Sequence, residues 1–220
     1  MIARTSELVV PRLRGVSHAA AFFLAVVAAA VVVVLAPTGR ATVAVAIYGA
    51  GLIALFGGSG LYHRWPGPAR FKPVLRRVDH SVIFIFIAAS YTPIALVAMH
   101  GAVAWVILGV AWAGAVAGVA FSLGWIDAPR GLVTGTYLAL GWVAVIALPQ
   151  LLGELRPAPL VLLACEGLLY SAGAIIYARQ RPDPWPGTFG FHEIFHALVI
   201  VAAAAQYIAL VVWILPSAGA

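Results

Sequence analysis

The sequence predicts an all-α integral membrane protein, built as a bundle of seven transmembrane helices. Of its 220 residues, 64% are hydrophobic and only 9% are charged, whereas a soluble domain usually carries about 25% charged residues. The apolar residues form seven runs, each near the roughly 20 residues that a helix needs to cross a bilayer. Basic residues gather in alternate connections between these runs. We therefore expect a multi-pass protein of the cell membrane. The heavy use of Ala, Val, Gly and Arg, with Lys72 as the only lysine, favours a high-GC bacterial source and hence the inner membrane of a bacterium.

The seven runs are expected to form one membrane domain. In chain order they cover Val16–Leu35, Ala41–Tyr62, Val78–Met99, Ala102–Leu123, Leu132–Leu148, Leu160–Ala178 and Phe191–Leu215. Connections that contain proline, glycine or both separate them. The first run exceeds the apolar core of about 7–15 residues found in a cleaved signal peptide, so it is interpreted as the first span. Pro93 falls inside the third run and should kink that helix, because proline has no N–H to donate.

The lysines and arginines predict the orientation of the bundle. All thirteen except Arg40 and Arg156 lie in the N-terminal segment or in the second, fourth and sixth connections. The positive-inside rule then places the N-terminus in the cytoplasm and the C-terminus outside. A net charge of +6 could also suit a nucleic acid. Because the charges are confined to short connections, we expect membrane lipid as the partner and no nucleic acid.

A cluster of polar residues is predicted at the cytoplasmic ends of the helices. His192 and His196, four residues apart, share one face of the seventh helix. His63 ends the second helix and Asp79 begins the third, at a similar depth in the membrane. Ser59 lies one turn before His63 on the same helical face. A polar group in a membrane helix is costly unless something binds it, so this cluster is the candidate functional site.

The histidines of this cluster indicate zinc. Three neutral histidines with an open fourth position are typical of catalytic zinc, whereas structural zinc sites are closed by four ligands. We therefore predict His63, His192 and His196 as zinc ligands, with water in the fourth position. Zinc would lower the pKa of that water to about 7 and so make hydroxide available. Asp79 and Ser59 would orient the water or take its proton.

The ordered motifs of the chain resemble the bacterial hemolysin III branch of the progestin and adipoQ receptor (PAQR) superfamily. The motifs are Ser59-x-x-x-His63, Arg77-Val78-Asp79-His80-Ser81, Ser90-Tyr91-Thr92-Pro93, Phe189-Gly190-Phe191-His192-Glu193-Ile194-Phe195-His196, Val16-Ser17-His18 and Leu169-Tyr170-Ser171-x-Gly173. The resemblance covers nearly the whole chain. It implies seven transmembrane helices and a zinc site with one histidine from the second helix and two from the seventh, accompanied by a serine and an aspartate. These are His63, His192, His196, Ser59 and Asp79 here. The superfamily includes alkaline ceramidases, which hydrolyse a lipid amide.

Several residues keep a second interpretation. His192-Glu193-x-x-His196 also matches the zinc-protease signature, in which the glutamate is the general base. Glu193 is therefore the alternative to Asp79, which the resemblance favours. His18 and His80 are interpreted as interfacial histidines. Cys165, the only cysteine, excludes an internal disulfide and a thiolate-rich metal site.

Glu166 and Gln206 depart from the pattern of the family. Glu166 stands where a small residue is expected, and Gln206 stands where relatives often have histidine. A carboxyl group in the middle of a membrane helix is costly, so Glu166 should pair with a polar neighbour or line a cavity. The sequence does not choose between these roles, and the departures leave the proposed zinc ligands intact.

Two classes of function follow from these observations. The first is a zinc-dependent hydrolase that cleaves an amide or ester bond of a lipid at the cytoplasmic leaflet. The second is a non-enzymatic protein with a structural zinc, either a cytolysin or a receptor or lipid-homeostasis factor. Pore formation has little support, because no amphipathic inserting segment and no polar stripe are found. The sequence assigns neither the substrate nor the oligomeric state, nor whether turnover occurs.

Overall fold

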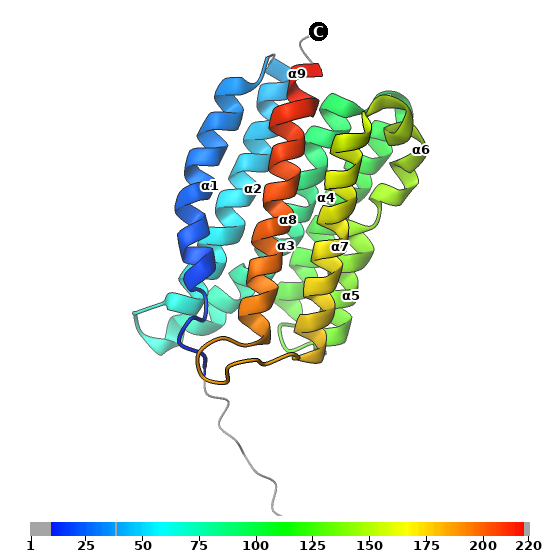
Figure 1. The fold of residues 1–220 in the computed structure, drawn as a ribbon. Coiled ribbons are helices and arrows are strands. Elements are labelled where there is room, and N and C mark those ends of the chain that lie inside the picture. Colours follow the sequence, from blue (N-terminus) through cyan, green and yellow to red (C-terminus); the bar gives the residue numbers. More distant parts are fainter. Residues whose placement is uncertain (1–9, 38, 218–220) are drawn as a thin grey trace, which may run out of the picture.

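The fold is a bundle of seven membrane-length helical spans, seen in a computed structural model that describes residues 10–37 and 39–217 (Figure 1). The predicted all-α, seven-helix fold class is confirmed. The long helices are α1 (Val16–Leu35), α2 (Gly39–Arg64), α3 (Lys72–Pro93), α4 (Gly101–Gly124), α5 (Arg130–Gly141), α6 (Ala144–Glu154), α7 (Pro157–Arg179) and α8 (Phe191–Ala209). Short elements are η1 (Ala69–Phe71), η2 (Ile94–Ala98), η3 (Leu210–Ile214) and α9 (Leu215–Ser217).

Neighbouring spans pack side by side, and the last span closes the bundle. Helix α1 packs on α2, α2 on α3, α3 on α4, and α7 on α8, which in turn contacts α1 (Figure 1). Small residues allow the closest approaches. A Cβ atom at Gly60 would lie 3.0 Å from the backbone of Ala19, and one at Gly49 would lie 2.7 Å from the Ala29 side chain. Such contacts between small residues are typical of membrane helices, where tight van der Waals packing drives association.

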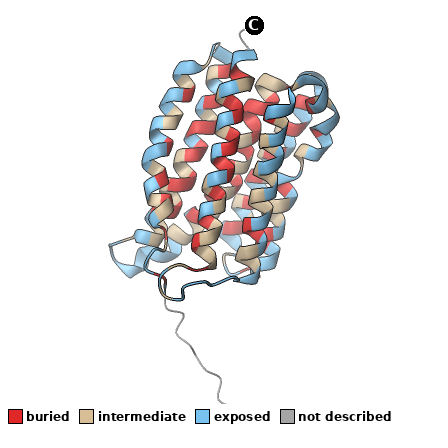
Figure 2. Ribbon diagram, in the orientation of Figure 1, coloured by how far each residue is buried: buried red, intermediate tan, exposed pale blue. Residues whose placement is uncertain are grey.

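The outer surface of the bundle is apolar. Large hydrophobic residues along the spans are exposed, among them Leu24 (71%) and Val34 (83%). Buried residues gather toward the centre of the bundle (Figure 2). Water-soluble monomers rarely expose contiguous apolar surface on this scale. Because the spans are largely helical, most of their backbone groups are satisfied internally, as hydrocarbon requires. The surface therefore suits contact with lipid.

The third span is disturbed at Pro93. Helix α3 ends at this residue, and the chain continues as the wider π-helical turn of η2. The irregularity has a local cause, since proline cannot donate a backbone hydrogen bond. The carbonyl of Ser90, three residues before Pro93, accepts a hydrogen bond from Gln206 Nε2 at 2.8 Å. This contact ties α3 to α8 near the middle of the bundle.

The fifth span differs from the expected single helix over Leu132–Leu148. It runs from Arg130 to Glu154 as two helices, α5 and α6, separated by a turn at Trp142 and Val143. The Tyr91 hydroxyl accepts a hydrogen bond from Ala144 N–H at 2.8 Å and also contacts the carbonyl of Gly141. A side chain of α3 thus replaces bonds that the broken helix lacks, which makes the break tolerable inside a membrane.

One end of the bundle carries the candidate site and is called here the histidine end. Helix α2 finishes there, and α1, α3 and α8 begin there (Figure 1). The described ends of the chain lie at opposite ends of the bundle. Which side of the membrane the histidine end faces stays a prediction from the positive-inside rule.

Candidate metal centre

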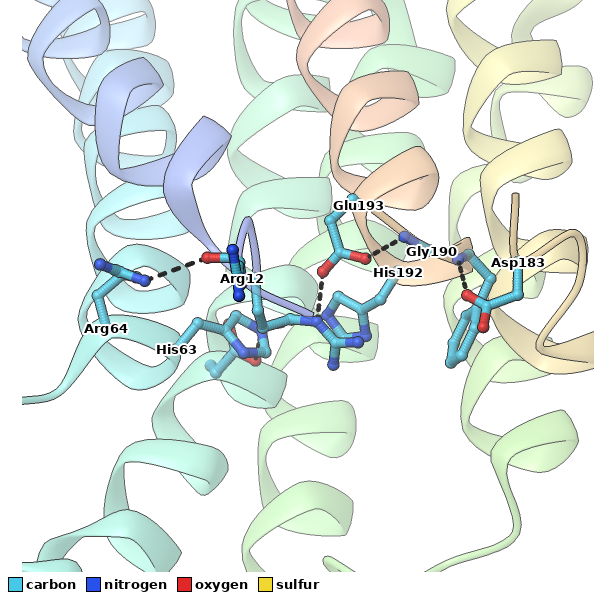
Figure 3. A network of polar contacts seen from close by, with 10 residues as sticks. Arg12, His63, Arg64, Asp183, Gly190, His192 and Glu193 are labelled. Atoms are coloured by element: carbon cyan, nitrogen blue, oxygen red, sulfur yellow. Dashed lines mark hydrogen bonds and ion pairs between the residues drawn. The ribbon is translucent and has the colours of Figure 1, made fainter. Parts of the chain in front are cut away.

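Three histidines from two helices meet at the histidine end. The last turn of α2 supplies His63, and the first turns of α8 supply His192 and His196. One ring nitrogen of each lies within 4.8 Å of the others, and the Nε2 atoms of His63 and His192 are 3.1 Å apart (Figure 3). Zinc–nitrogen bonds of about 2.0–2.1 Å in a tetrahedron place the nitrogens about 3.3 Å apart. The cluster could therefore hold a metal ion after small side-chain movements.

Asp79 and Ser59 lie beside this cluster and are both buried. The Asp79 Oδ2 atom is 3.9 Å from His63 Nε2, which is too far for a hydrogen bond. The Ser59 hydroxyl donates a hydrogen bond to the Asp79 carboxylate. The structure thus brings the five predicted residues of the α2, α3 and α8 ends to one place.

Glu193, the alternative candidate for the general base, has two partners at the start of α8. Its Oε1 atom is 2.5 Å from Arg14 Nε, and its Oε2 atom accepts a 2.7 Å hydrogen bond from the N–H of Gly190. The second contact caps the start of α8, because the Glu193 side chain pairs with the N–H of the residue that precedes the helix (Figure 3). Both carboxylate oxygens therefore have structural partners, and the side chain holds the N-terminal segment against α8.

The segment before α1 lies against the cluster. Its backbone pairs with the loop before α8, since Arg12 N–H donates to Gly187 O at 3.0 Å and Leu13 N–H donates to Thr188 O at 3.2 Å. Gly15 follows, with φ of 76° and with His63 so close that a Cβ atom would clash with it. Only glycine combines a left-handed backbone with so little space. No local pattern in the sequence marks this segment as part of the site, because its contacts join residues far apart in the chain.

His18 is a member of the site rather than an interfacial residue. Its ring is 2% exposed and stacks on the His196 ring, with centroids 3.7 Å apart and planes 14° from parallel. Its Nε2 atom lies 3.3 Å from the His196 carbonyl oxygen. In the sequence, the motif Val16-Ser17-His18 was the feature that could have indicated a role for His18 in the site. The other histidine interpreted as interfacial, His80, is half-buried and lies outside the three-histidine cluster.

A cavity of about 840 Å³ opens from the cluster into the bundle. His63, Asp79 and His196 line it, and farther in its walls are largely apolar, with Ile83 and Leu163 among them. Four cationic residues also line it: Arg14, Lys72, Arg76 and Arg130. The volume falls in the range of about 300–1,000 Å³ typical of small-molecule sites. A long apolar chain with a polar end therefore matches its volume and its lining.

Sequence comparison identifies the family of this chain. The family described as Haemolysin-III related matches residues 7–207, which is most of the chain. The chain belongs to the hemolysin III family. The resemblance seen in the motifs, including the place of this family within the PAQR superfamily, is confirmed. The protein is accordingly a multi-pass protein of the cell membrane.

Individual hemolysin III relatives are similar over most of the chain. "Hemolysin-3" of Bacillus cereus is 28% identical over 181 residues, which cover 82% of this chain and 80% of that protein. "Hemolysin-3 homolog" of Bacillus subtilis is 30% identical over 165 residues, covering 75% and 74%. "Heptahelical transmembrane protein ADIPOR1" of Oryza sativa is 29% identical over 163 residues, covering 66% and 43%. No solved structure matches the chain.

Proposed function

We propose that the protein is a zinc-dependent membrane hydrolase that cleaves an amide or ester bond of a lipid at the cytoplasmic leaflet. The observation that carries this proposal is the position of the three-histidine cluster, with Asp79 beside it, at the head of a largely apolar cavity of about 840 Å³. A polar reaction centre and a space for an acyl chain are thereby adjacent.

The donor set of the cluster fits zinc. Imidazole nitrogen is a common zinc ligand, and three of them leave one coordination position open. Zinc bound there would supply a Lewis acid and a water that ionises near neutral pH. His18 supports this arrangement, because its contacts with the ring and backbone of His196 limit the movement of that side chain.

Asp79 is the preferred general base. Its carboxylate lies beside His63 and accepts a hydrogen bond from Ser59, which orients it. From this position it can accept the proton of an attacking water and later return it to the leaving amine or alcohol. Glu193 is less suited to this role, because Arg14 and Gly190 already engage its carboxylate.

The alternative is a non-enzymatic protein with a structural metal. One observation favours it: the histidines come from α2 and α8, so an ion would also link two helices. Two relatives carry the name hemolysin, which would suit a cytolysin. A receptor or lipid-homeostasis factor would use the same helix link without turnover. In each case loss of the ion would loosen the bundle.

The test uses detergent-purified protein with its metal content measured, assayed against a panel of lipid amides and esters. We expect zinc at about one ion per chain and hydrolysis that chelation abolishes and zinc restores. Melting temperature is measured on the same samples, because a structural ion would lower it sharply when removed. Zinc-loaded, folded protein that hydrolyses no lipid of the panel would contradict the enzyme and favour the alternative.

A further inference from the structure

The cavity contains a second polar region, away from the histidine cluster. Gln206 on α8 is 2% exposed, and its amide nitrogen is held by the Ser90 carbonyl at 2.8 Å. Its Oε1 atom and the hydroxyl of Tyr170 on α7 are both buried without a hydrogen-bond partner among residues 10–37 and 39–217. Both residues line the cavity. An unpaired buried polar atom costs free energy, so each of these atoms calls for a partner.

Glu166 belongs to the same polar region. It lies one turn before Tyr170 on the same face of α7 and lines the same cavity. Within the described part of the chain, its carboxyl group has neither a hydrogen bond nor an ion pair. Ionisable groups inside a membrane bundle are costly and usually serve a function. The metal centre does not use this carboxyl group.

The packing of α7 on α8 places these groups at one depth. A Cβ atom at Gly173 would contact Phe195 at 3.2 Å and Leu198 at 3.5 Å, which aligns the two antiparallel helices. From this contact, Glu166 lies seven residues along α7, a rise of about 10 Å. Gln206 lies eight residues along α8, a rise of about 12 Å. Because the helices are antiparallel, both rises lead away from the contact toward the same end of the bundle. Ten residues from His196 to Gln206 correspond to about 15 Å. The polar region therefore lies deep in the cavity, well removed from the histidines.

We propose that Glu166, Tyr170 and Gln206 form a subsite that binds a hydroxyl group in the middle of a lipid acyl chain. A hydroxyl both donates and accepts hydrogen bonds. It can donate to the oxygen of Gln206 or Glu166 and accept from the hydroxyl of Tyr170, which pairs the atoms that lack partners. The inference rests on the proposed function only in taking the ligand to be a lipid whose polar end reaches the histidine cluster. The subsite predicts that lipids with a hydroxyl in the middle of the acyl chain bind more tightly than lipids with an unsubstituted chain.

The competing explanation is that ordered water satisfies these groups. Buried water typically forms two to four hydrogen bonds to such atoms. A hydroxylated chain would then displace water without gain, and its affinity would equal that of an unsubstituted chain. The two explanations therefore differ in a measurable affinity ratio.

The experiment measures displacement of a fluorescent fatty acid from the detergent-purified full chain. The competitors are stearate, stearate with a mid-chain hydroxyl, and the isomer with its hydroxyl next to the carboxylate. We expect the mid-chain isomer to bind roughly two- to tenfold more tightly than the other two, as one net hydrogen bond predicts. Equal affinities for all three would overturn the proposal in favour of water.

Two variants locate the effect. Tyr170→Phe removes only a hydroxyl that lacks a partner, and Glu166→Leu removes a costly carboxyl group, so both should fold. Each should lower the affinity ratio of the mid-chain isomer to stearate to about one, since each removes a subsite partner of the hydroxyl. The matched control is Tyr207→Phe. The hydroxyl of Tyr207 donates to Ala28 O at 3.0 Å, and Tyr207 is not among the residues that line the cavity. A preference that survives both Tyr170→Phe and Glu166→Leu, or that Tyr207→Phe removes equally, would refute the subsite.

The outcome is separable from that of the proposed hydrolase activity. Neither stearate nor its hydroxylated isomers contain a bond for a hydrolase to cleave, so the affinity ratio does not depend on turnover. A mid-chain preference without any hydrolysis would support the subsite and contradict the enzyme. Hydrolysis without a preference would support the enzyme and contradict the subsite.

Discussion

The His18 ring lies flat against the ring of His196, 3.7 Å between centroids, and its Nε2 atom is 3.3 Å from the His196 carbonyl oxygen. One helix thus fixes the orientation of a candidate metal ligand on another. We predict that His18→Ala lowers zinc affinity about 10–100-fold, the usual effect of removing a group that orients a ligand. His18→Phe keeps the stacking and should lose less. Zinc titration of the purified variants measures this, and unchanged affinity in His18→Ala would show that His196 needs no support.

Substitution of the histidines tests the metal centre directly. His63→Ala, His192→Ala or His196→Ala should each lower zinc occupancy sharply from about one ion per chain, because three ligands become two. The control is His100→Ala, since His100 is exposed and pairs with Glu154. Metal analysis of each purified variant gives the answer. Full occupancy in the three single variants would remove these residues from the ligand set.

The two carboxylates near the histidines should respond differently to neutralisation. Asp79→Asn should retain zinc and lose about 10²–10⁴-fold in turnover, the usual contribution of general acid–base catalysis. Ser59→Ala should lose less, because its hydroxyl only orients the carboxylate. Glu193→Gln should retain turnover and lose stability of about 1–3 kcal/mol, because Arg14 keeps no charged partner. Lipid hydrolysis and thermal melting on the same preparations separate these effects. Reversed results would make Glu193 the base.

The close contact between Gly15 and His63 predicts a sensitive glycine. Gly15→Ala puts a Cβ atom into the His63 side chain at a left-handed backbone position, so His63 must move and zinc affinity should fall. Gly131→Ala is the matched control, since nothing lies within 4 Å of its Cβ position. Zinc titration and melting curves compare the two variants. Equal zinc affinity in both would mean that the N-terminal segment does not position the site.

Orientation in the membrane can be tested by labelling single cysteines. In a Cys165→Ser background, Ala69→Cys marks the connection between α2 and α3, and Ala158→Cys marks the start of α7. The positive-inside rule predicts that a membrane-impermeant thiol reagent labels Ala158→Cys in intact cells. Ala69→Cys should react only after permeabilisation. The opposite pattern would invert the bundle and move the site to the outer leaflet.

Sequence alone determined the features that depend on local chemistry. Apolar runs of membrane length predicted seven spans, because a bilayer imposes its thickness on each helix. The spacing of His192 and His196 placed both on one helical face, because the period of the α-helix is fixed. Because successive spans cross the membrane in opposite directions, the end of the second span and the start of the third lie at the same end of the bundle. His63 and Asp79 were therefore predicted to lie together, and the structure places them there.

Tertiary structure decided what depends on how the helices rotate and pack. Three contacts join residues from separate segments of the chain: the approach of His18 to His196, the pairing of Arg14 with Glu193, and the bond of Tyr91 at the break in the fifth span. The depth shared by Glu166 and Gln206 likewise follows from the alignment of α7 with α8. Periodicity fixes which residues share a face of one helix, but it does not state which other helix that face meets. Close packing of side chains selects that partner, and it acts only once the spans come together.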